Sequence, residues 1–273
     1  MSQDGDFELV TLRNGARAVR DRVSGEVMHP SVGPWAEANR LYVEQTKLVE
    51  RLREDGPQLR ILDVGLGAGT NALAALDAAR ALGKERRRAL EVVSLERELG
   101  PLRLARSDAA GFPHQARWSQ AVDAILSGAA YEDDGLSWRL IPGELPGTFD
   151  SAQGLFDLMY YDPFSPKTNP SLWTPAVFAR VHKLCGEGAQ LVTYSAATPT
   201  RVSLLVAGFF VGAGWSIGTK GETTLAARSR HALEQPLAER WLARWERSDA
   251  RAPHGEPLTS ALEEKLRAHP QFG

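Results

Sequence analysis

A short apolar strand, a glycine-rich turn and the start of a helix follow one another in Ile61-Leu62-Asp63-Val64-Gly65-Leu66-Gly67-Ala68-Gly69-Thr70-Asn71. Glycines permit positive φ angles and close approach of the backbone to a ligand. The first turn of a helix leaves free N–H groups, and open parallel sheets bind ligands beyond the carboxyl ends of their strands. We therefore predict a ligand-binding turn here rather than a tight connection alone.

Apolar segments of strand and helix length alternate on both sides of this turn. Strands separated by helices indicate a parallel sheet covered on both faces, which is an α/β fold. The predicted strands are 60–64, 90–95, 137–141, 156–161 and 189–194, with an antiparallel closing pair at 215–219 and 223–227. The predicted helices are 71–82, 99–110, 115–126, 175–184 and 200–213.

Three parts of the chain differ in pattern. Residues 1–56 hold an Asn14-Gly15 turn between apolar runs, typical of a β-hairpin, and a helical pattern over 34–54. Residues 57–228 form the alternating core, and residues 229–273 form a charged tail with a helix around 237–245. We expect an N-terminal arm, one core domain and a C-terminal tail.

Composition excludes several classes of protein. The 273 residues carry a net charge of −2, are 43% hydrophobic and include one cysteine, Cys185. A disulfide framework, a cysteine-based zinc site and an iron–sulfur cluster are therefore excluded, and the scattered histidines indicate no metal site. The N-terminus lacks an apolar signal, and the most apolar segment, 202–214, is too short for a membrane helix. We expect a cytoplasmic protein without a membrane span.

The glycine pattern is similar to motif I of S-adenosyl-L-methionine methyltransferases, in which an acid-ended strand precedes G-x-G-x-G. A dinucleotide fingerprint would require glycine at position 70, where threonine stands. The resemblance implies a Rossmann-like methyltransferase fold: a seven-stranded, mostly parallel sheet of order 3-2-1-4-5-7-6, with helices on both faces and an N-terminal β-hairpin arm. It also implies that S-adenosyl-L-methionine contacts Asp63, Gly65, Gly67, Gly69 and Asn71.

Acidic residues follow the next two strands. Glu96 ends the strand after the helix, where a carboxylate accepts both ribose hydroxyls in adenosine-binding α/β domains. Gly143-Glu144 follows the third strand, where such enzymes often bind the adenine amino group. A glutamate in a loop is also common without any ligand, so both interpretations of Glu144 stay open.

A proline-rich loop follows the fourth strand, with the sequence Asp162-Pro163-Phe164-Ser165-Pro166-Lys167-Thr168-Asn169-Pro170-Ser171-Leu172-Trp173. Its beginning resembles the D/N-P-P-Y/F motif of amine methyltransferases, which hold an attacking nitrogen with the acid or amide. We predict that Asp162 is catalytic, chiefly by orienting the acceptor amine. The predicted acceptor contacts are Phe164, Lys167, Asn169 and Trp173.

The whole loop resembles the D-G-F-x-P-x-K-N-P-x-x-W signature of the MnmC methyltransferase domain. Two further segments are similar to that family: Met28-His29-Pro30-Ser31-Val32-Gly33 with Glu37 and Tyr42, and the glycine turn. The chain departs from the pattern at Pro163, Thr168 and Ala68. The resemblance implies N-methylation of the 5-aminomethyl group of the wobble (2-thio)uridine of tRNA by a standalone form that lacks the FAD-dependent oxidoreductase domain.

That substrate makes tRNA the expected partner. Lys167 and the arginines within 13–22 and 86–88 are then candidate phosphate contacts. Three alternatives stay open: another S-adenosyl-L-methionine methyltransferase, a spermidine-synthase-like aminopropyltransferase acting on a small amine, and a non-catalytic protein of the same fold. The sequence does not indicate an oligomeric state.

Overall fold

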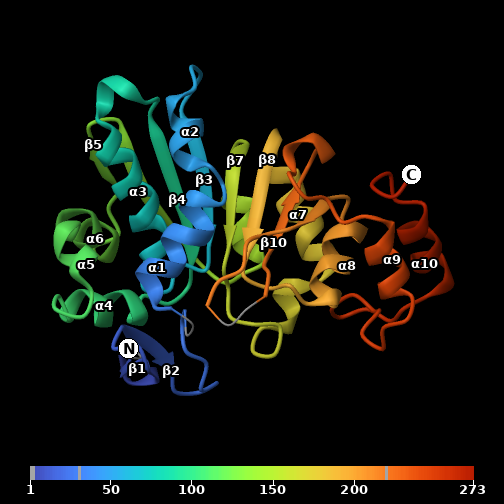
Figure 1. The fold of residues 1–273 in the computed structure, drawn as a ribbon. Helices are drawn as coiled ribbons and strands as arrows, with labels where there is room; N and C mark the ends of the chain where they lie inside the picture. Colours follow the sequence, from blue (N-terminus) through green and yellow to red (C-terminus); the bar gives the residue numbers. More distant parts are fainter. Residues whose placement is uncertain (1–3, 30–31, 219–220) are drawn as a thin grey trace.

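The computed structural model describes residues 4–29, 32–218 and 221–273. Its centre is a sheet of eight strands in the order β5-β6-β4-β3-β7-β8-β10-β9 (Figure 1). Neighbours from β6 to β8 pair in parallel, whereas β5, β10 and β9 pair antiparallel with their neighbours. The strands are β3 (Leu59–Val64), β4 (Leu90–Glu96), β5 (Tyr131–Asp133), β6 (Leu136–Pro142), β7 (Phe156–Tyr161), β8 (Cys185–Thr193), β9 (Phe210–Ala213) and β10 (Thr224–Ala227).

The predicted order of seven strands is confirmed by the run from β6 to β9, but the predicted number is wrong because β5 adds an eighth strand. β5 pairs with β6 through a two-residue turn in which Asp134 and Gly135 have φ angles of 51° and 74°. Positive φ at both positions is typical of a tight hairpin turn, and Asp-Gly is its usual sequence. The Asp134-Gly135 pair is thus a local sequence signal for this hairpin.

The second correction concerns the segment before β10. Helix α8 (Thr198–Val206) ends seven residues earlier than predicted, because Gly208 adopts a φ of 96° and stops it. The strand predicted at 215–219 lies earlier in the chain. It is β9 (Phe210–Ala213), whose four residues fall at the end of the segment predicted as helix 200–213. Thr219 lies outside the described residues. The predicted strand at 223–227 corresponds to β10, which lies between β8 and β9.

Side chains of the central strands alternate between two hydrophobic clusters, as the period of a strand requires. Ile61 and Leu158 belong to the first cluster, and their chain neighbours Leu62 and Met159 belong to the second. The first cluster includes residues of α1 (Pro34–Ala38), the π-helix η2 (Asn39–Glu44), α2 (Leu48–Arg53), α3 (Thr70–Leu82) and α6 (Ser119–Leu126). The second includes residues of α7 (Pro175–Leu184), α8, α9 (Glu239–Trp245) and α10 (Ser260–Arg267).

The remaining helices are short. They are α4 (Gly100–Ser107), α5 (Pro113–Arg117) and the 3₁₀ segments η1 (Asp4–Asp6), η3 (Lys84–Arg86), η4 (Gly147–Ser151), η5 (Pro170–Trp173) and η6 (Arg230–Ala232). No helix among the described residues is long and apolar enough to cross a membrane.

The N-terminal arm is the predicted hairpin, made of β1 (Phe7–Thr11) and β2 (Arg17–Asp21). It lies below the carboxyl ends of the central strands and next to α4 (Figure 1). The Arg17 guanidinium bonds Asp108 at 3.0 Å, and Phe7 packs so closely on Gly100 that an added Cβ would lie 2.7 Å from the ring. These contacts fix the arm over the sheet edge where ligands bind in this architecture.

The helix predicted over 34–54 is divided into three parts. The π-helix η2 follows α1 directly, and Lys47, with a φ of 53°, separates it from α2. A π-helix has a wider turn than an α-helix, and such segments are frequent at functional sites. The widened turn changes which side chains of this segment face the sheet.

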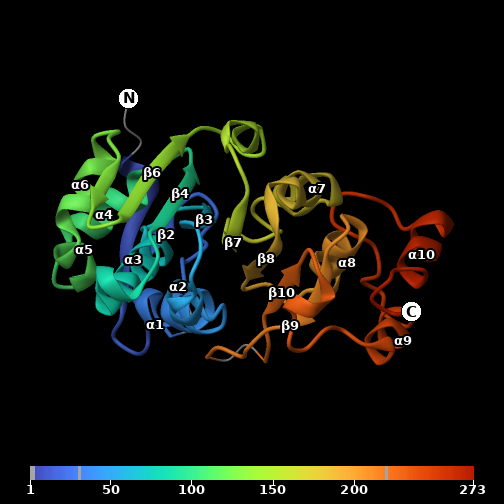
Figure 2. The same ribbon diagram turned by 90° about the horizontal axis from the view of Figure 1, so that it is seen from above.

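The C-terminal tail packs against the core, with α9 and α10 at the opposite end of the molecule from α4, α5 and α6 (Figures 1 and 2). Trp245 is 1% exposed within the second cluster. The Gln271 side chain bonds the N–H and the carbonyl of Val211 at 2.6 and 2.7 Å, which fastens the end of the tail to β9.

We expect Trp245→Ala to lower the free energy of unfolding by about 3–5 kcal/mol, because it leaves a cavity in a closed cluster. Urea denaturation of the whole chain measures this difference. Leu155→Ala is the matched control, since Leu155 is 54% exposed and its loss removes little buried area. Equal midpoints for both variants would show that the tail does not contribute to the cooperative core.

Candidate functional site

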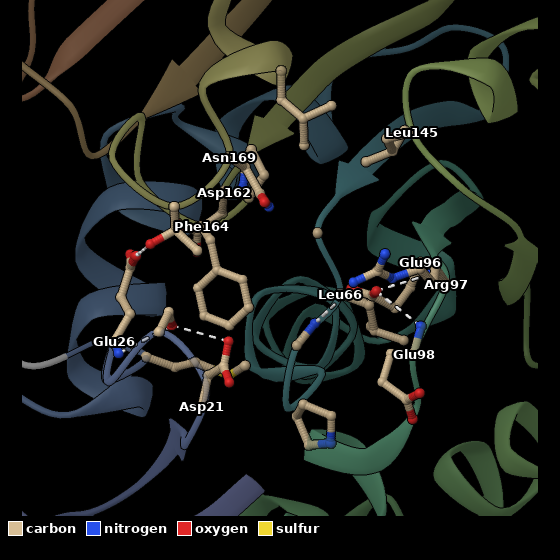
Figure 3. A pocket seen from close by; sticks show the side chains of 18 of the residues that line it. Asp21, Glu26, Leu66, Glu96, Arg97, Glu98, Leu145, Asp162, Phe164 and Asn169 are labelled. Atoms are coloured by element: carbon tan, nitrogen blue, oxygen red, sulfur yellow. Dashed lines mark hydrogen bonds between the residues drawn. The ribbon is translucent and has the colours of Figure 1, made fainter. Parts of the chain in front are cut away.

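A cavity of about 720 Å³ opens between the carboxyl ends of β3, β4, β6 and β7 and the N-terminal arm (Figure 3). Four loops after these strands contribute to its lining, together with the arm and Tyr194. The loop segments are 65–67, 96–98, 143–145 and 162–164, and the arm contributes residues from 6 to 29.

The glycine turn lies at the floor of the cavity. Gly65 has a φ of 87°, and an added Cβ would lie 2.9 Å from the backbone of Asp162 and Pro163. Gly67 has a φ of 52° and faces Met28 of the arm, whose Sδ would be 3.2 Å from an added Cβ. Gly69 caps α3 and packs on Leu102, so it shapes the turn without lining the cavity.

Glu96 lies on the side of the cavity opposite Phe164 (Figure 3). Its Oε1 accepts hydrogen bonds from the backbone N–H groups of Arg97 and Glu98 at 2.8 and 3.0 Å, and its Oε2 accepts one from Gly67 at 3.4 Å. Burial raises the pKa of this carboxyl, although the three N–H groups oppose the shift. Oε1 therefore uses both of its lone pairs, whereas Oε2 keeps a second one, so Glu96 is held in one orientation and can still accept a hydroxyl donor.

Gly143 and Glu144 also line the cavity, at its mouth. Gly143 has a φ of 149° and lies against Thr148, where a Cβ would meet the hydroxyl at 2.9 Å. The exposed Glu144 carboxylate forms an ion pair of 2.9 Å with Arg97. Glu144 therefore lies where the predicted contact with adenine could form, and in this structure its carboxylate pairs with Arg97.

Asp63 lies behind the turn and does not line the cavity. The Ser94 hydroxyl donates to Asp63 Oδ2 at 2.7 Å, and the Trp138 indole N–H donates to that hydroxyl at 2.9 Å. Burial raises the pKa of the Asp63 carboxyl to about 7. Asp63, a predicted cofactor contact, is thus placed behind the turn and held there by Ser94, and a contact with the cofactor stays a prediction.

Asp162 follows β7 and faces the cavity (Figure 3). Its Oδ2 accepts a hydrogen bond from the Asn71 side-chain amide at 2.8 Å and lies 3.6 Å from His29 Nε2. Burial raises the pKa of the Asp162 carboxyl, and the neighbouring His29 and Asn71 oppose that shift. Asn71, a predicted cofactor contact, is absent from the lining and instead holds Asp162.

Two residues of the helix before motif I join this group, and sequence reasoning assigned them no role. Glu37 lines the cavity, and its Oε1 lies 3.7 Å from His29 Nδ1. Tyr42 is fully buried, and burial, followed by the Asp162 carboxylate, raises the pKa of its hydroxyl. Tyr42 follows Glu37 by five positions. An α-helix would turn side chains at that spacing apart, and the wider π turn brings both toward Asp162. Their signal was the resemblance at 28–42; Pro30 and Ser31 of that segment lie outside the described residues.

The proline-rich loop forms another wall of the cavity. The ring of Phe164 points into the cavity and Asn169 lies at its edge (Figure 3). Lys167 is exposed and does not line the cavity. Trp173 does not reach it either: the indole is fully buried and donates to the Phe164 carbonyl at 3.0 Å. The prediction that Trp173 contacts the acceptor is therefore replaced by a role in fixing the loop.

The arm fastens this loop through Glu26, another residue that the sequence did not reveal. One Glu26 oxygen accepts the Ser165 N–H at 2.9 Å, and the other accepts the Ser165 and Thr168 hydroxyls at 2.9 and 2.6 Å. A single carboxylate thus holds Ser165 and Thr168, which follow Glu26 by 139 and 142 positions in the chain.

Arg86, Arg87 and Arg88 precede β4, whereas the cavity lies beyond its other end. The Arg87 side chain is 1% exposed, and Arg88 donates to the carbonyl of Arg51 at 3.0 Å. Arg87 and Arg88 thus hold local structure away from the cavity, whereas Arg86 is exposed, and a phosphate contact by this cluster stays a prediction.

Carboxylates dominate the charged lining. Eight acidic residues face the cavity, against one arginine and one histidine among the described residues. The acids are Asp6, Asp21, Glu26, Glu37, Glu96, Glu98, Glu144 and Asp162. A cation compensates buried carboxylates, so this cavity suits positively charged ligands better than anions.

Residues 113–229 match the family described as S-adenosyl-L-methionine-dependent methyltransferase. The chain is 30% identical over 228 residues to the tRNA 5-methylaminomethyl-2-thiouridine biosynthesis bifunctional protein MnmC of Methylibium petroleiphilum. That alignment covers 80% of this chain and 34% of that protein, so the chain spans about a third of its relative.

Two solved structures have a similar fold. MnmC2 from Aquifex aeolicus superimposes with a TM-score of 0.74 at 24% identity, covering 97% of this chain and 84% of that one. A probable spermidine synthase from Corynebacterium glutamicum superimposes with a TM-score of 0.51 at 13% identity, covering 93% and 94%.

We expect Asp63→Asn to become more stable relative to the wild type as pH rises from 4 to 8. The folded state keeps the Asp63 proton up to about pH 7, whereas the unfolded chain releases it near pH 3.8. Rising pH therefore favours unfolding of the wild type, by up to about 4 kcal/mol for this group. Urea denaturation at four pH values measures the difference, with the exposed Asp55→Asn as control. A difference that does not change with pH would contradict a buried neutral Asp63.

Proposed function

Because this chain contains an MnmC-like, S-adenosyl-L-methionine-dependent methyltransferase domain, we propose that it methylates a primary amine, the 5-aminomethyl group of the wobble uridine of tRNA. The comparisons confirm the predicted family resemblance and the predicted cofactor. The observation that supports an amine as the methyl acceptor is the largely buried carboxylate of Asp162, which faces the cavity at the end of β7.

The cavity fits the cofactor on three grounds. Gly65 and Gly67 leave room that side chains would fill, Glu96 presents an oriented carboxylate oxygen for a ribose hydroxyl, and the acidic lining suits a sulfonium and an ammonium group. When bound, S-adenosyl-L-methionine supplies a methyl group already activated by its positive sulfur. The protein therefore contributes mainly by positioning.

Asp162 is the group we expect to hold the acceptor. A carboxylate accepts hydrogen bonds and attracts an ammonium ion, and burial strengthens that attraction. Asn71 fixes the carboxylate from the side of α3, so the amine meets a preoriented acceptor. Such a site selects nitrogen nucleophiles that arrive as cations.

The tRNA substrate is taken from the name of the relatives, and two features support it. Phe164 presents an aromatic ring inside the cavity, on which a base turned out of its strand can stack. The loop that carries this ring has the family signature. Phosphate contacts would lie outside the acidic cavity, and the exposed Lys167 beside it is the candidate.

A second candidate function is aminopropyl transfer to a small amine. The fold likeness to a probable spermidine synthase and the acidic cavity favour it. The two functions differ in the group transferred and in the size of the acceptor, so one assay separates them.

We expect binding of S-adenosyl-L-methionine to release protons and to strengthen as pH rises from 5 to 8. Burial raises the pKa of Glu96 and of Asp162 in the free protein, and a bound cation or hydroxyl donor favours the ionised forms. Calorimetry in two buffers with different ionisation enthalpies measures the released protons. Glu96→Gln should weaken binding by about 1.5–3 kcal/mol. Equal heats in both buffers would contradict the linkage.

The proposed function is tested by single-turnover methylation of tRNA that carries 5-aminomethyl-2-thiouridine at the wobble position. We expect a mass gain of one methyl group on that nucleoside and no transfer to a small diamine. Asp162→Ala should lower the rate by about 10²–10⁴-fold while changing cofactor affinity by less than about tenfold. Asp162→Asn should retain more activity than Asp162→Ala if Asp162 orients the amine.

Two results would contradict these assignments. Transfer of an aminopropyl group from decarboxylated S-adenosylmethionine to a diamine would favour the second candidate. Wild-type rates in both Asp162 variants would show that Asp162 has no part in the reaction.

A further inference from the structure

His29 lies between two carboxylates at the end of the arm. Its Nε2 is 3.6 Å from Asp162 Oδ2 and its Nδ1 is 3.7 Å from Glu37 Oε1, while the side chain is 12% exposed and lines the cavity. Its backbone has a φ of 53°, a conformation uncommon for histidine outside functional or tightly turned segments. The three side chains come from the arm, from α1 and from the end of β7.

A primary alkyl amine poses a chemical problem that Asp162 does not solve alone. At neutral pH the amine is an ammonium ion, whose nitrogen has no free electron pair for attack. Asp162 attracts this ion, and a carboxylate that stabilises the charge also opposes loss of the proton. Among the described residues that line the cavity, His29 is the one side chain whose ordinary titration range is near neutral pH.

We propose that His29 accepts the proton that the acceptor ammonium gives up, while Asp162 holds the nitrogen and Glu37 holds the imidazole ring. The ammonium N–H bond breaks, its electron pair stays on nitrogen, and the proton goes to Nε2 of the neutral ring, which becomes imidazolium. This role rests on the proposed function, because it requires an amine acceptor.

The surroundings favour the charged product of this transfer. The charged or titratable groups that act on His29 are Glu37 from α1, Asp162 after β7, Asp63 from β3 and His114 from α5. Tyr42 from η2 and Tyr194 after β8 act on its two carboxylate partners. Burial lowers the pKa of His114 to about 4, so that ring is neutral at pH 7. The nearest charges are therefore the two carboxylates, which stabilise an imidazolium placed between them. The bound ammonium and sulfonium cations oppose a resting imidazolium beside the same carboxylates, so the ring is neutral in the complex until the ammonium gives up its proton.

A purely structural role, in which His29 bridges Glu37 and Asp162, would also explain its distances to the two carboxylates. The pH dependence of the methylation rate separates this role from proton acceptance. If His29 accepts the proton, its loss becomes less harmful at high pH, where the amine deprotonates in solution. If His29 only positions Asp162, its loss reduces the rate equally at every pH.

The test compares wild type with His29→Gln in single-turnover methylation of 5-aminomethyl-2-thiouridine tRNA from pH 6 to 9.5, with saturating cofactor. We expect a loss of about 100-fold or more at pH 7 that narrows by about tenfold per pH unit toward the pKa of the amine. Cofactor affinity by calorimetry should change less than about tenfold, which also shows that the variant is folded. His231→Gln, on the exposed η6 segment, is the matched control.

A second measurement needs no turnover. In the protein without ligands, NMR of ¹³C-labelled histidine follows protonation of the His29 ring, assigned by its absence in His29→Gln. We expect Glu37→Gln and Asp162→Asn each to move the titration midpoint of this ring to lower pH, because each removes an anion that stabilises the imidazolium. A midpoint unchanged in both variants would overturn the proposed arrangement.

The outcomes separate this inference from the proposed function. Wild-type protein that methylates the tRNA amine, together with a His29→Gln deficit that is constant with pH or absent, overturns the proton-acceptor role alone. Wild-type protein that leaves the amine unmethylated at every pH overturns the proposed function and this role with it.

Discussion

Gly65 passes so close to the backbone of Asp162 and Pro163 that no side chain fits between them. This contact joins the turn after β3 to the loop after β7, the two neighbouring strands at the middle of the sheet. It fixes the distance between the glycine turn and Asp162. Glu96 and Asn71 then attach to this frame from β4 and α3, so one short approach of two backbones sets the geometry of the whole cavity.

The frame carries several buried carboxylates, which are expensive to ionise away from water. Burial raises the pKa of Asp63, Glu96 and Asp162, and each has hydrogen-bond donors that partly offset this. Glu96 and Asp162 thus place ionisable carboxyls in the cavity, where a bound cation favours their charged forms. Ligand binding and ionisation are coupled as a result, and part of the folding stability is given up for the function.

The arm completes the site from a distant part of the chain. Glu26 ties the proline-rich loop, Met28 faces Gly67, and His29 reaches Asp162. The arm itself is held to α4 by Arg17 and Phe7. These contacts fix the arm relative to the loop and the glycine turn, and fixed geometry is what transfer between two bound groups requires.

The sequence alone determined the glycine turn and the positions of Glu96 and Asp162, because each depends on local periodicity or on where a strand ends. The strand order followed from the family resemblance of the motifs, not from periodicity. The Asp134-Gly135 hairpin was also encoded locally. Only the tertiary structure decided that Asn71 supports Asp162, that Trp173 is buried under the loop, that β9 begins at Phe210 and that Glu26, His29 and Glu37 reach the cavity. These outcomes depend on contacts between residues far apart in the chain and on a π turn, and neither leaves a periodic signal in the sequence.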